Sequence, residues 1–434
     1  MQDAHLNLLC TGDIHLGRHP TRIPSEIDGQ RFSPKSVWSS TVDEAIRRAV
    51  DAVLISGDVV DRENRFFEAY GAFENGVRRL EEADIPVVVV AGNHDFDVLP
   101  RLVRELDREN LHLVGNDGDW DRWTLSRDGQ AELHVDGWSF PKEHVIDSPL
   151  EDYEPSPDPD VPVIGLLHAD LDTPGSEYAP VQSNDILGKP VDAWVLGHIH
   201  RPAVHNEADP LVLYPGSPQA LDPGERGAHG PWMVRIDGSG DVDAEQIPLA
   251  TVRYDHVGVD VSDADDPKAI PSMVRDRIED RVRSDVELGA LELLLARVRL
   301  TGRTAAHGEI HRRKASIEDD LGLKVGTTPV RIESIEVDTK PAVDLAALAQ
   351  GESPAAYVAD LLLAIENDRV TDEYGSLVQD ALASIQEAHE SGAYSVLRRQ
   401  GELDTPDESD AVETLESQAR VLLDTLLEQK EGAA

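Results

Sequence analysis

Residues 86–95 read Pro-Val-Val-Val-Val-Ala-Gly-Asn-His-Asp, an apolar run that ends in a Gly-Asn-His-Asp motif. Residues 6–15, 52–62 and 193–200 have the same form, because each passes from an apolar run into a motif of Gly with Asp or His. Short apolar runs bounded in this way are typical of buried parallel strands. The carboxyl ends of parallel strands meet at one edge of a sheet. The sequence therefore predicts an α/β fold with a cluster of polar side chains at that edge.

This cluster has the composition of a metal site. Carboxylate oxygen and imidazole nitrogen together suit Mn²⁺, Fe²⁺ or Zn²⁺, whereas an all-oxygen site suits Mg²⁺ or Ca²⁺. Two ions about 3.5–4 Å apart can clamp the attacking and leaving oxygens of a phosphoryl transfer. We expect Asp58 to bridge them, because a carboxylate has two oxygens and Asp58 stands alone after its strand. The polar side chains at the four strand ends are Asp13, His15, Asp58, Asn93, His94, His198 and His200.

A lone histidine, His168, follows a further apolar run at residues 164–167. With it, the motifs resemble the ordered pattern D-x-H, G-D, G-N-H-[DE], H, G-H-x-H of the calcineurin-like metallophosphoesterase superfamily, over roughly residues 5–250. The resemblance implies a two-sheet α/β sandwich with two divalent metal ions. Manganese is the expected ion, with iron, zinc and magnesium as alternatives.

The resemblance also implies a role for each residue of the motifs. His94 would be a general acid or transition-state donor rather than a ligand, and Asp95 would orient its ring. Asp61 is a candidate substrate contact, with an ordinary helix-capping role equally open. Arg62 is either a phosphate contact or a solvated surface arginine. The first ion would be held by Asp13, His15, Asp58 and His200. The second ion would be held by Asp58, Asn93, His168 and His198.

The composition limits the class of protein. A single cysteine, Cys10, rules out an internal disulfide framework and fits a reducing compartment. The chain has neither an apolar run long enough to span a membrane nor a secretory leader, so we expect a cytoplasmic protein. The net charge of −44 comes from 84 acidic and 40 basic residues. A surface for a basic partner would explain it, but the acid is spread along the chain. A halophilic protein, working in salt that screens charges, is the favoured interpretation.

The chain divides into three predicted parts. Residues 1–250 would form the metallophosphoesterase (nuclease) domain. Residues 251–340 alternate as β-α-β-α-β, and they resemble the capping domain of the SbcD-like and YhaO-like DNA repair exonuclease branch. Residues 341–434 are helical by composition. Their last segment carries an apolar stripe that includes Val412, Leu415, Ala419 and Leu422. The branch implies an SMC-like (SbcC-type) ATPase as the partner of this stripe. Packing on the same chain and a homodimer are the alternatives.

Two classes of function follow. The first is a metal-dependent DNA exonuclease or endonuclease subunit that hydrolyses phosphodiester bonds in double-strand-break repair. The second is a phosphoesterase of the same superfamily that acts on nucleotides, cyclic nucleotides or phosphoproteins. A scaffold with a decayed metal site is a third reading, and the complete ligand set argues against it.

Overall fold

A computed structural model of the chain describes residues 6–24, 27, 29–61, 66–154, 161–264, 266–283, 291–320, 323–325, 328–391 and 405–432. The chain forms two compact units. The first comprises Met1–Gly302 and Glu309–Thr339, and the second comprises Arg303–Gly308 and Lys340–Ala434. None of the described helices is apolar over a length that could cross a membrane.

The first unit contains two six-stranded sheets, which confirms the two-sheet fold that the resemblance implies. In the first sheet, of order β14-β13-β1-β2-β3-β4, strands β1 to β4 run parallel, and β13 pairs antiparallel with β1. In the second sheet, of order β11-β12-β10-β7-β6-β5, the four inner strands run parallel. The first sheet consists of β1 (Leu6–Thr11), β2 (Ala52–Ile55), β3 (Val87–Val89), β4 (Leu111–Leu113), β13 (Trp232–Ile236) and β14 (Val242–Gln246). The second consists of β5 (Asp121–Arg127), β6 (Gln130–Trp138), β7 (Val163–His168), β10 (Ala193–Gly197), β11 (Ala203–Asn206) and β12 (Leu211–Tyr214).

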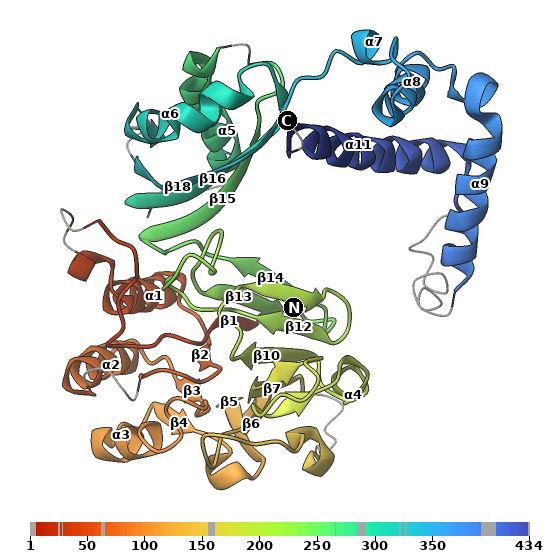
Figure 1. Cartoon of the computed structure of the whole chain (residues 1–434). Helices are drawn as coiled ribbons and strands as arrows, with labels where there is room; N and C mark the ends of the chain where they lie inside the picture. The colour runs from red at the N-terminus through yellow and green to blue at the C-terminus, as the bar shows by residue number, and fades with distance from the viewer. Residues whose placement is uncertain are drawn as a thin grey trace. The chain divides into compact units, whose positions relative to one another are not determined.

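Alternation along the strands separates two cores. Leu8 and Cys10 of β1 lie between the two sheets, in a cluster that also contains Leu166 of β7. Leu9, between them in sequence, faces the other way and packs with Trp38 of α1. Strand side chains point alternately to opposite faces, so one apolar strand serves both cores. In Figure 1 the helices α1 (Pro34–Arg48), α2 (Phe66–Glu81) and α3 (Leu99–Leu106) line the side of the first sheet away from the second.

Short elements complete this part of the chain. They are the helix α4 (Ser183–Leu187), the strands β8 (Asp170–Leu171) and β9 (Pro180–Val181), and the 3-10 turns at Gly29–Phe32, Asn116–Gly118, Pro149–Asp152 and Pro267–Ala269. The proline-rich segment at 147–162, whose composition is typical of a loop, includes residues 155–160, which lie outside the described residues.

The next module is a four-stranded sheet of order β15-β16-β18-β17, with α5 and α6 on one side of it in Figure 1. It has one strand more than the predicted β-α-β-α-β pattern, because the short β17 pairs antiparallel with β18. Three residues are too few for alternation to reveal a strand. The elements are β15 (Val252–Asp260), α5 (Ile270–Arg283), β16 (Leu293–Thr304), α6 (His307–Asp320), β17 (Leu323–Val325) and β18 (Thr328–Pro341).

The second unit is a helical bundle in which α11 (Glu408–Gly432) packs on α8 (Pro354–Glu366). On the apolar face of α11, Ala419 and Leu423 are buried in a cluster with Leu362 of α8. Val412 and Leu415 pack into a second cluster with α9. Of the predicted stripe, Leu422 stays 49% exposed. Packing on the same chain therefore accounts for most of the stripe. The helices are α7 (Leu345–Leu348), α8 (Pro354–Glu366), α9 (Val370–Glu390) and α11 (Glu408–Gly432).

Candidate metal centre

The predicted site residues follow five parallel strands of the two sheets. Asp13 and His15 follow β1, Asp58 follows β2, and Asn93 and His94 follow β3. In the second sheet His168 ends β7, and it pairs in register with Gly197, the last residue of β10. His198 and His200 come directly after β10. The carboxyl edges of both sheets thus contribute to one place.

The backbone at this edge is held in an unusual conformation. Asp13, His15, Asp58 and His198 have positive φ angles of 48°, 48°, 51° and 97°. Such angles are uncommon outside glycine and cost about 1–3 kcal/mol each. Hydrogen bonds between the loops stabilise them: Asp13 N donates to Gly57 O and His15 N donates to Asp58 O, both over 3.0 Å. The strain concentrates on candidate ligands, as it does at functional sites.

Two motif glycines leave the space that the side chains need. A Cβ atom on Gly92 would lie 2.2 Å from Asp58 Oδ1. A Cβ atom on Gly197 would lie 2.0 Å from Ser56 O and 2.6 Å from His168 Nδ1. The glycines are therefore required by close approach of the neighbouring loops.

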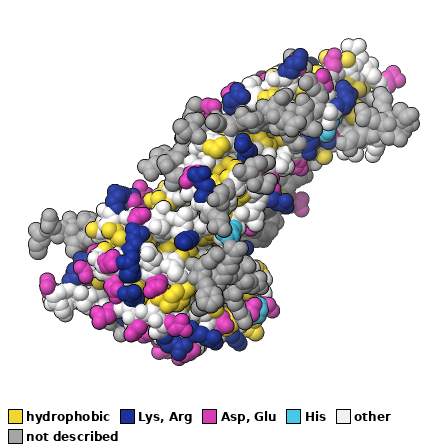
Figure 2. Space-filling view, turned by 90° about the vertical axis from the view of Figure 1, so that its left-hand side faces the viewer, with side chains coloured by type: hydrophobic (Ala, Val, Ile, Leu, Met, Phe, Trp, Pro, Cys, Tyr) yellow, Lys and Arg dark blue, Asp and Glu magenta, His cyan; other side chains and the backbone are white. Residues whose placement is uncertain are grey.

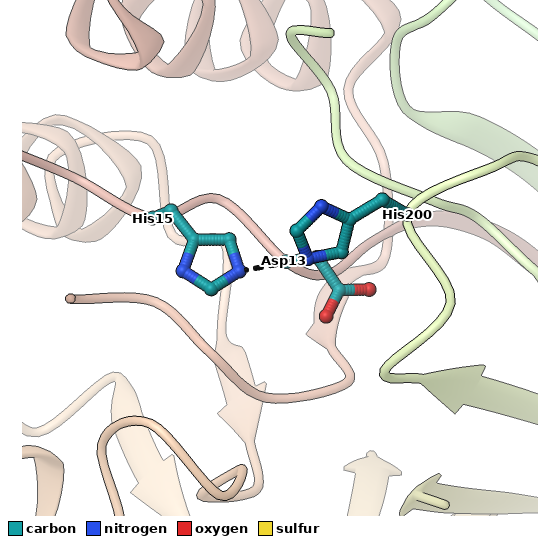
Figure 3. Close-up of side chains that lie close together, drawn as sticks. All are labelled: Asp13, His15 and His200. Atoms are coloured by element: carbon teal, nitrogen blue, oxygen red, sulfur yellow. Dashed lines mark hydrogen bonds between the residues drawn. The ribbon is translucent and has the colours of Figure 1, made fainter. Parts of the chain in front are cut away.

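On one side of the centre, Asp13, His15 and His200 converge (Figure 3). His15 Nε2 lies 3.0 Å from His200 Nε2. His200 Nδ1 lies 2.8 Å from Glu225 Oε1. A carboxylate can only accept, so Nδ1 carries the proton of this bond, and Nε2 is the ring nitrogen that faces the centre.

On the other side, Asp13, Asp58 and His168 converge. His168 Nδ1 donates to Ser56 O over 2.9 Å, so its Nε2 also faces the centre, 2.9 Å from Asn93 Oδ1. Asp58 Oδ2 lies 3.5 Å from His168 Nε2 and 3.7 Å from His15 Nε2. The carboxylate of Asp58 thus stands between the two groups, where a bridging ligand would stand.

The electrostatics of the centre favour a bound cation. Burial raises the pKa of Asp13 to about 7, and it raises the pKa of Asp58 as well. Burial lowers the pKa of His168 to about 3, so this ring is neutral and can bind a metal. Burial also lowers the pKa of His200, but the hydrogen bond to Glu225 and the charge of Asp13 outweigh burial and raise it to about 9. Two buried carboxylates among inward-facing imidazole nitrogens have the donor set of a divalent metal site.

His198 lies at the margin of this centre. Its ring stands 5.4 Å from the His168 ring and 4.8 Å from the Tyr178 ring, centroid to centroid. Its Nε2 atom is 3.9 Å from Asp170 Oδ2. Among the described His, Cys, Asp and Glu residues, His198 is in none of the three groups whose ligand atoms lie within 4.8 Å of one another. Its role as a ligand stays a prediction.

His94 is exposed at the rim of the centre. Its ring meets the His15 ring edge to face, with centroids 5.1 Å apart, while its backbone N donates to Asp58 Oδ1 over 2.9 Å. His15, Asp61 and His94 form a third group of converging ligand atoms. Arg18 Nε lies 3.4 Å from Asp61 Oδ2. Arg62 lies outside the described residues.

Asp95 does not have the expected geometry. We expected it to orient the His94 ring, but both of its oxygens accept from backbone amides. Oδ2 accepts from Val59 N at 2.7 Å and Val60 N at 3.4 Å, and Oδ1 accepts from Gly92 N at 2.8 Å. The fully buried Asp95 therefore ties the loop after β2 to the loop after β3.

Sequence reasoning missed Glu225, the partner of His200. Glu225 is 7% exposed and lies in the loop between β12 and β13, which carries no metal motif. The local signal nearest to it is the Tyr-Pro-Gly-Ser-Pro sequence at 214–218, which is typical of a turn. Ser217 of that turn contacts His200, because Ser217 N donates to His200 O over 2.9 Å.

Comparison with known proteins agrees with this geometry. The calcineurin-like phosphoesterase family matches residues 6–202, and the middle domain of metallophosphoesterase YhaO matches residues 254–340. An uncharacterized metallophosphoesterase, YhaO of Bacillus subtilis, is 31% identical over 278 residues, which are 63% of this chain and 65% of that protein. The DNA double-strand break repair protein Mre11 of Halobacterium salinarum is 25% identical over 358 residues, 81% of this chain and 84% of that protein.

The alignment with YhaO spans just under two thirds of that relative's length. The matched ranges include every predicted ligand and nearly all of the four-stranded sheet of β15 to β18 with its helices. The ordered motifs, the two-sheet architecture and these matches agree, and the resemblance drawn from the sequence is confirmed: residues 6–202 form a calcineurin-like metallophosphoesterase domain.

Proposed function

We propose that this protein is a metal-dependent nuclease subunit that hydrolyses phosphodiester bonds in DNA during double-strand-break repair. The observation that carries the proposal is the convergence of five candidate ligands where the carboxyl edges of the two sheets meet. They are the buried Asp13, His15, Asp58 and His168 and the half-buried His200. Two divalent ions there would lower the pKa of a water molecule and neutralise charge on a phosphoryl group. Manganese is the expected ion.

The residues around the ions would divide the remaining work. Asp58, placed between the two groups of ligands, would hold both ions at a fixed separation. His94 is exposed and beside the His15 ring, so it can reach a substrate phosphate and donate a proton to the leaving oxygen. Arg18, paired with Asp61 at the same rim, can contact a neighbouring phosphate of the strand.

The choice of DNA rests on the relatives. Relatives named as DNA double-strand break repair proteins align with up to 81% of the chain, beyond the metal-binding part. The net charge of −44 opposes binding of a polyanion at low salt. Figure 2 shows acidic side chains interspersed with Lys and Arg on the face that it presents. We therefore propose that the protein works at high salt in the cytoplasm, where local basic positions decide binding.

The proposed partner is an SMC-like ATPase. Because most of the α11 stripe is buried within the bundle, the surface offered to such a partner must include the side chains that remain exposed. Tyr357, Val421 and Leu422 are 70%, 60% and 49% exposed in the helical unit. The alternative is that these exposed side chains form the interface of a homodimer.

The alternative function is hydrolysis of nucleotides, cyclic nucleotides or phosphoproteins at the same centre. At low salt the acidic balance of the chain would favour nucleotides over DNA, since a small substrate needs few basic contacts.

One experiment separates the two functions. The protein is incubated with Mn²⁺ at molar salt with linear double-stranded DNA, single-stranded DNA and p-nitrophenyl phosphate, alone and with the ATPase. We expect cleavage of DNA and weak hydrolysis of the monoester. Asp58→Ala should abolish cleavage. Asp119→Ala removes an exposed carboxylate that is not among the predicted site residues, and it should leave cleavage unchanged. Fast monoester hydrolysis with intact DNA in all conditions would establish the alternative.

A further inference from the structure

Glu225 has a buried carboxylate, and burying a carboxylate costs free energy unless its oxygens accept hydrogen bonds. Its Oε1 atom accepts from His200 Nδ1 over 2.8 Å. Its Oε2 atom accepts from Leu221 N over 2.7 Å and from Ser217 Oγ over 3.0 Å. The three bonds fix the carboxylate in one orientation, with one oxygen toward the metal centre and the other toward its own loop.

The bond to Glu225 decides how His200 presents itself. The ring can donate to the carboxylate only through Nδ1–H, so Nε2 points at the centre, 3.0 Å from His15 Nε2. The main chain of His200 is fixed by the same loop, because Ser217 N donates to His200 O over 2.9 Å. Both the ring and the backbone of one candidate ligand thus depend on residues 217–225.

On the side away from His200, this loop is anchored by β15 and the residue before it. Gln219, which is 1% exposed, donates through Nε2 to Val252 O over 3.1 Å and accepts through Oε1 from Thr251 N over 3.0 Å. Gly227 N donates to Tyr254 O over 3.1 Å. Val252 and Tyr254 belong to β15, so the loop lies between β15 and the metal centre within one compact unit.

We propose that Glu225 is a positioning residue that holds His200 ready to bind a metal ion, and that β15 anchors the loop that carries it. Histidine ligands are commonly oriented by a carboxylate on their second ring nitrogen, and loss of that carboxylate weakens metal affinity by about 10–100-fold. Through this loop, the four-stranded sheet of β15 to β18 would set the geometry of a metal ligand at the edge of the two six-stranded sheets. The inference rests on the proposed metal centre but not on DNA as the substrate.

The test measures metal binding rather than cleavage. Full-length protein is titrated with Mn²⁺, and the free ion is counted by its electron paramagnetic resonance signal. Glu225→Gln keeps the size of the side chain but cannot satisfy three donors, and we expect the affinity for one of two ions to fall by about 10–100-fold. Asp222→Asn is the matched control, because it removes the same charge from an exposed position in the same loop. We expect it to bind as the unmodified protein does.

A double-mutant cycle separates positioning from general support of the fold. If Glu225 acts through His200, then Glu225→Gln should not weaken Mn²⁺ binding further in a His200→Ala background. Additive losses would overturn the proposal. Glu225→Asp keeps the charge but withdraws it by one methylene, and it should also weaken one ion, which gives a second measurement if the Gln variant unfolds.

The anchoring by β15 has its own variant. Gln219→Met keeps the length of the side chain but removes its bonds to Val252 and Thr251, and we expect a smaller loss of affinity for the same ion. Full affinity in this variant would overturn the anchoring role. Full affinity in Glu225→Gln, with two ions bound to the unmodified protein, would overturn the positioning role. Failure of the unmodified protein to bind Mn²⁺ would instead refute the proposed function.

Discussion

Replacement of Gly92 by alanine should damage the metal centre without damaging the fold. Gly92 does not have a positive φ angle, so its backbone accepts an alanine. The added Cβ atom, however, would lie 2.2 Å from Asp58 Oδ1 and 2.8 Å from His168 Cε1. Real contacts are essentially never shorter than 3.0 Å, so the Asp58 carboxylate must retreat by roughly 0.8 Å. A functional site tolerates about 0.5 Å, and a displacement near 1 Å costs about 10²-fold in rate.

We therefore expect Gly92→Ala to lower turnover, and affinity for Mn²⁺, on the order of 10²-fold. Mn²⁺ titration and steady-state hydrolysis measure the two effects. Gly71→Ala is the matched control, because Gly71 lies inside α2 with no atom within 4 Å of its Cβ position. It should gain about 0.5–1 kcal/mol of stability and keep full metal affinity. Unchanged Mn²⁺ binding by Gly92→Ala would refute the assignment of Asp58 and His168 to the centre.

Three further substitutions have definite outcomes. His94→Gln should lower kcat by about 10²–10⁴-fold with metal content unchanged, and loss of an ion on metal analysis would contradict its role. Asp95→Ala should lower the free energy of unfolding by about 3–6 kcal/mol in urea titrations, because it leaves three backbone amides of buried loops without an acceptor. A change under about 1 kcal/mol would contradict the role of Asp95 in tying the loop after β2 to the loop after β3. Leu423→Ala should destabilise the helical unit by about 2–5 kcal/mol, whereas the exposed neighbour Leu422→Ala should change it by less than about 0.5 kcal/mol; equal effects would contradict the packing of α11.

The sheet edge was predictable because its signals are local. Residues 86–95 show both a buried strand and the polar motif that follows it, and the rule that parallel strands end at one edge brings distant motifs together. The same reasoning could not settle Asp95. A carboxylate beside His94 in sequence is equally able to bind a ring or backbone amides, and only the fold decides which donors surround it.

Glu225 and the α11 stripe show what local patterns leave open. Glu225 is 25 residues from His200 in an irregular loop, so no periodicity connects the two side chains. The spacing of Val412, Leu415 and Ala419 correctly indicated one buried helix face, but the spacing is the same whether that face meets the helices of this bundle or another protein. The short β17 was missed for a third reason, since three residues carry too little pattern to distinguish a strand from a turn.

The pairing of β1 with β13 has a consequence for biosynthesis. Leu8 stands opposite Val234, so β1 is synthesised more than 220 residues before one of its two neighbours. Until then, one side of β1 exposes unpaired amide and carbonyl groups, which invite pairing with other chains. A fragment that ends at residue 202 would contain every metal motif and still aggregate. One that ends after β14, at Gln246, would contain β13 and so complete the pairing of β1.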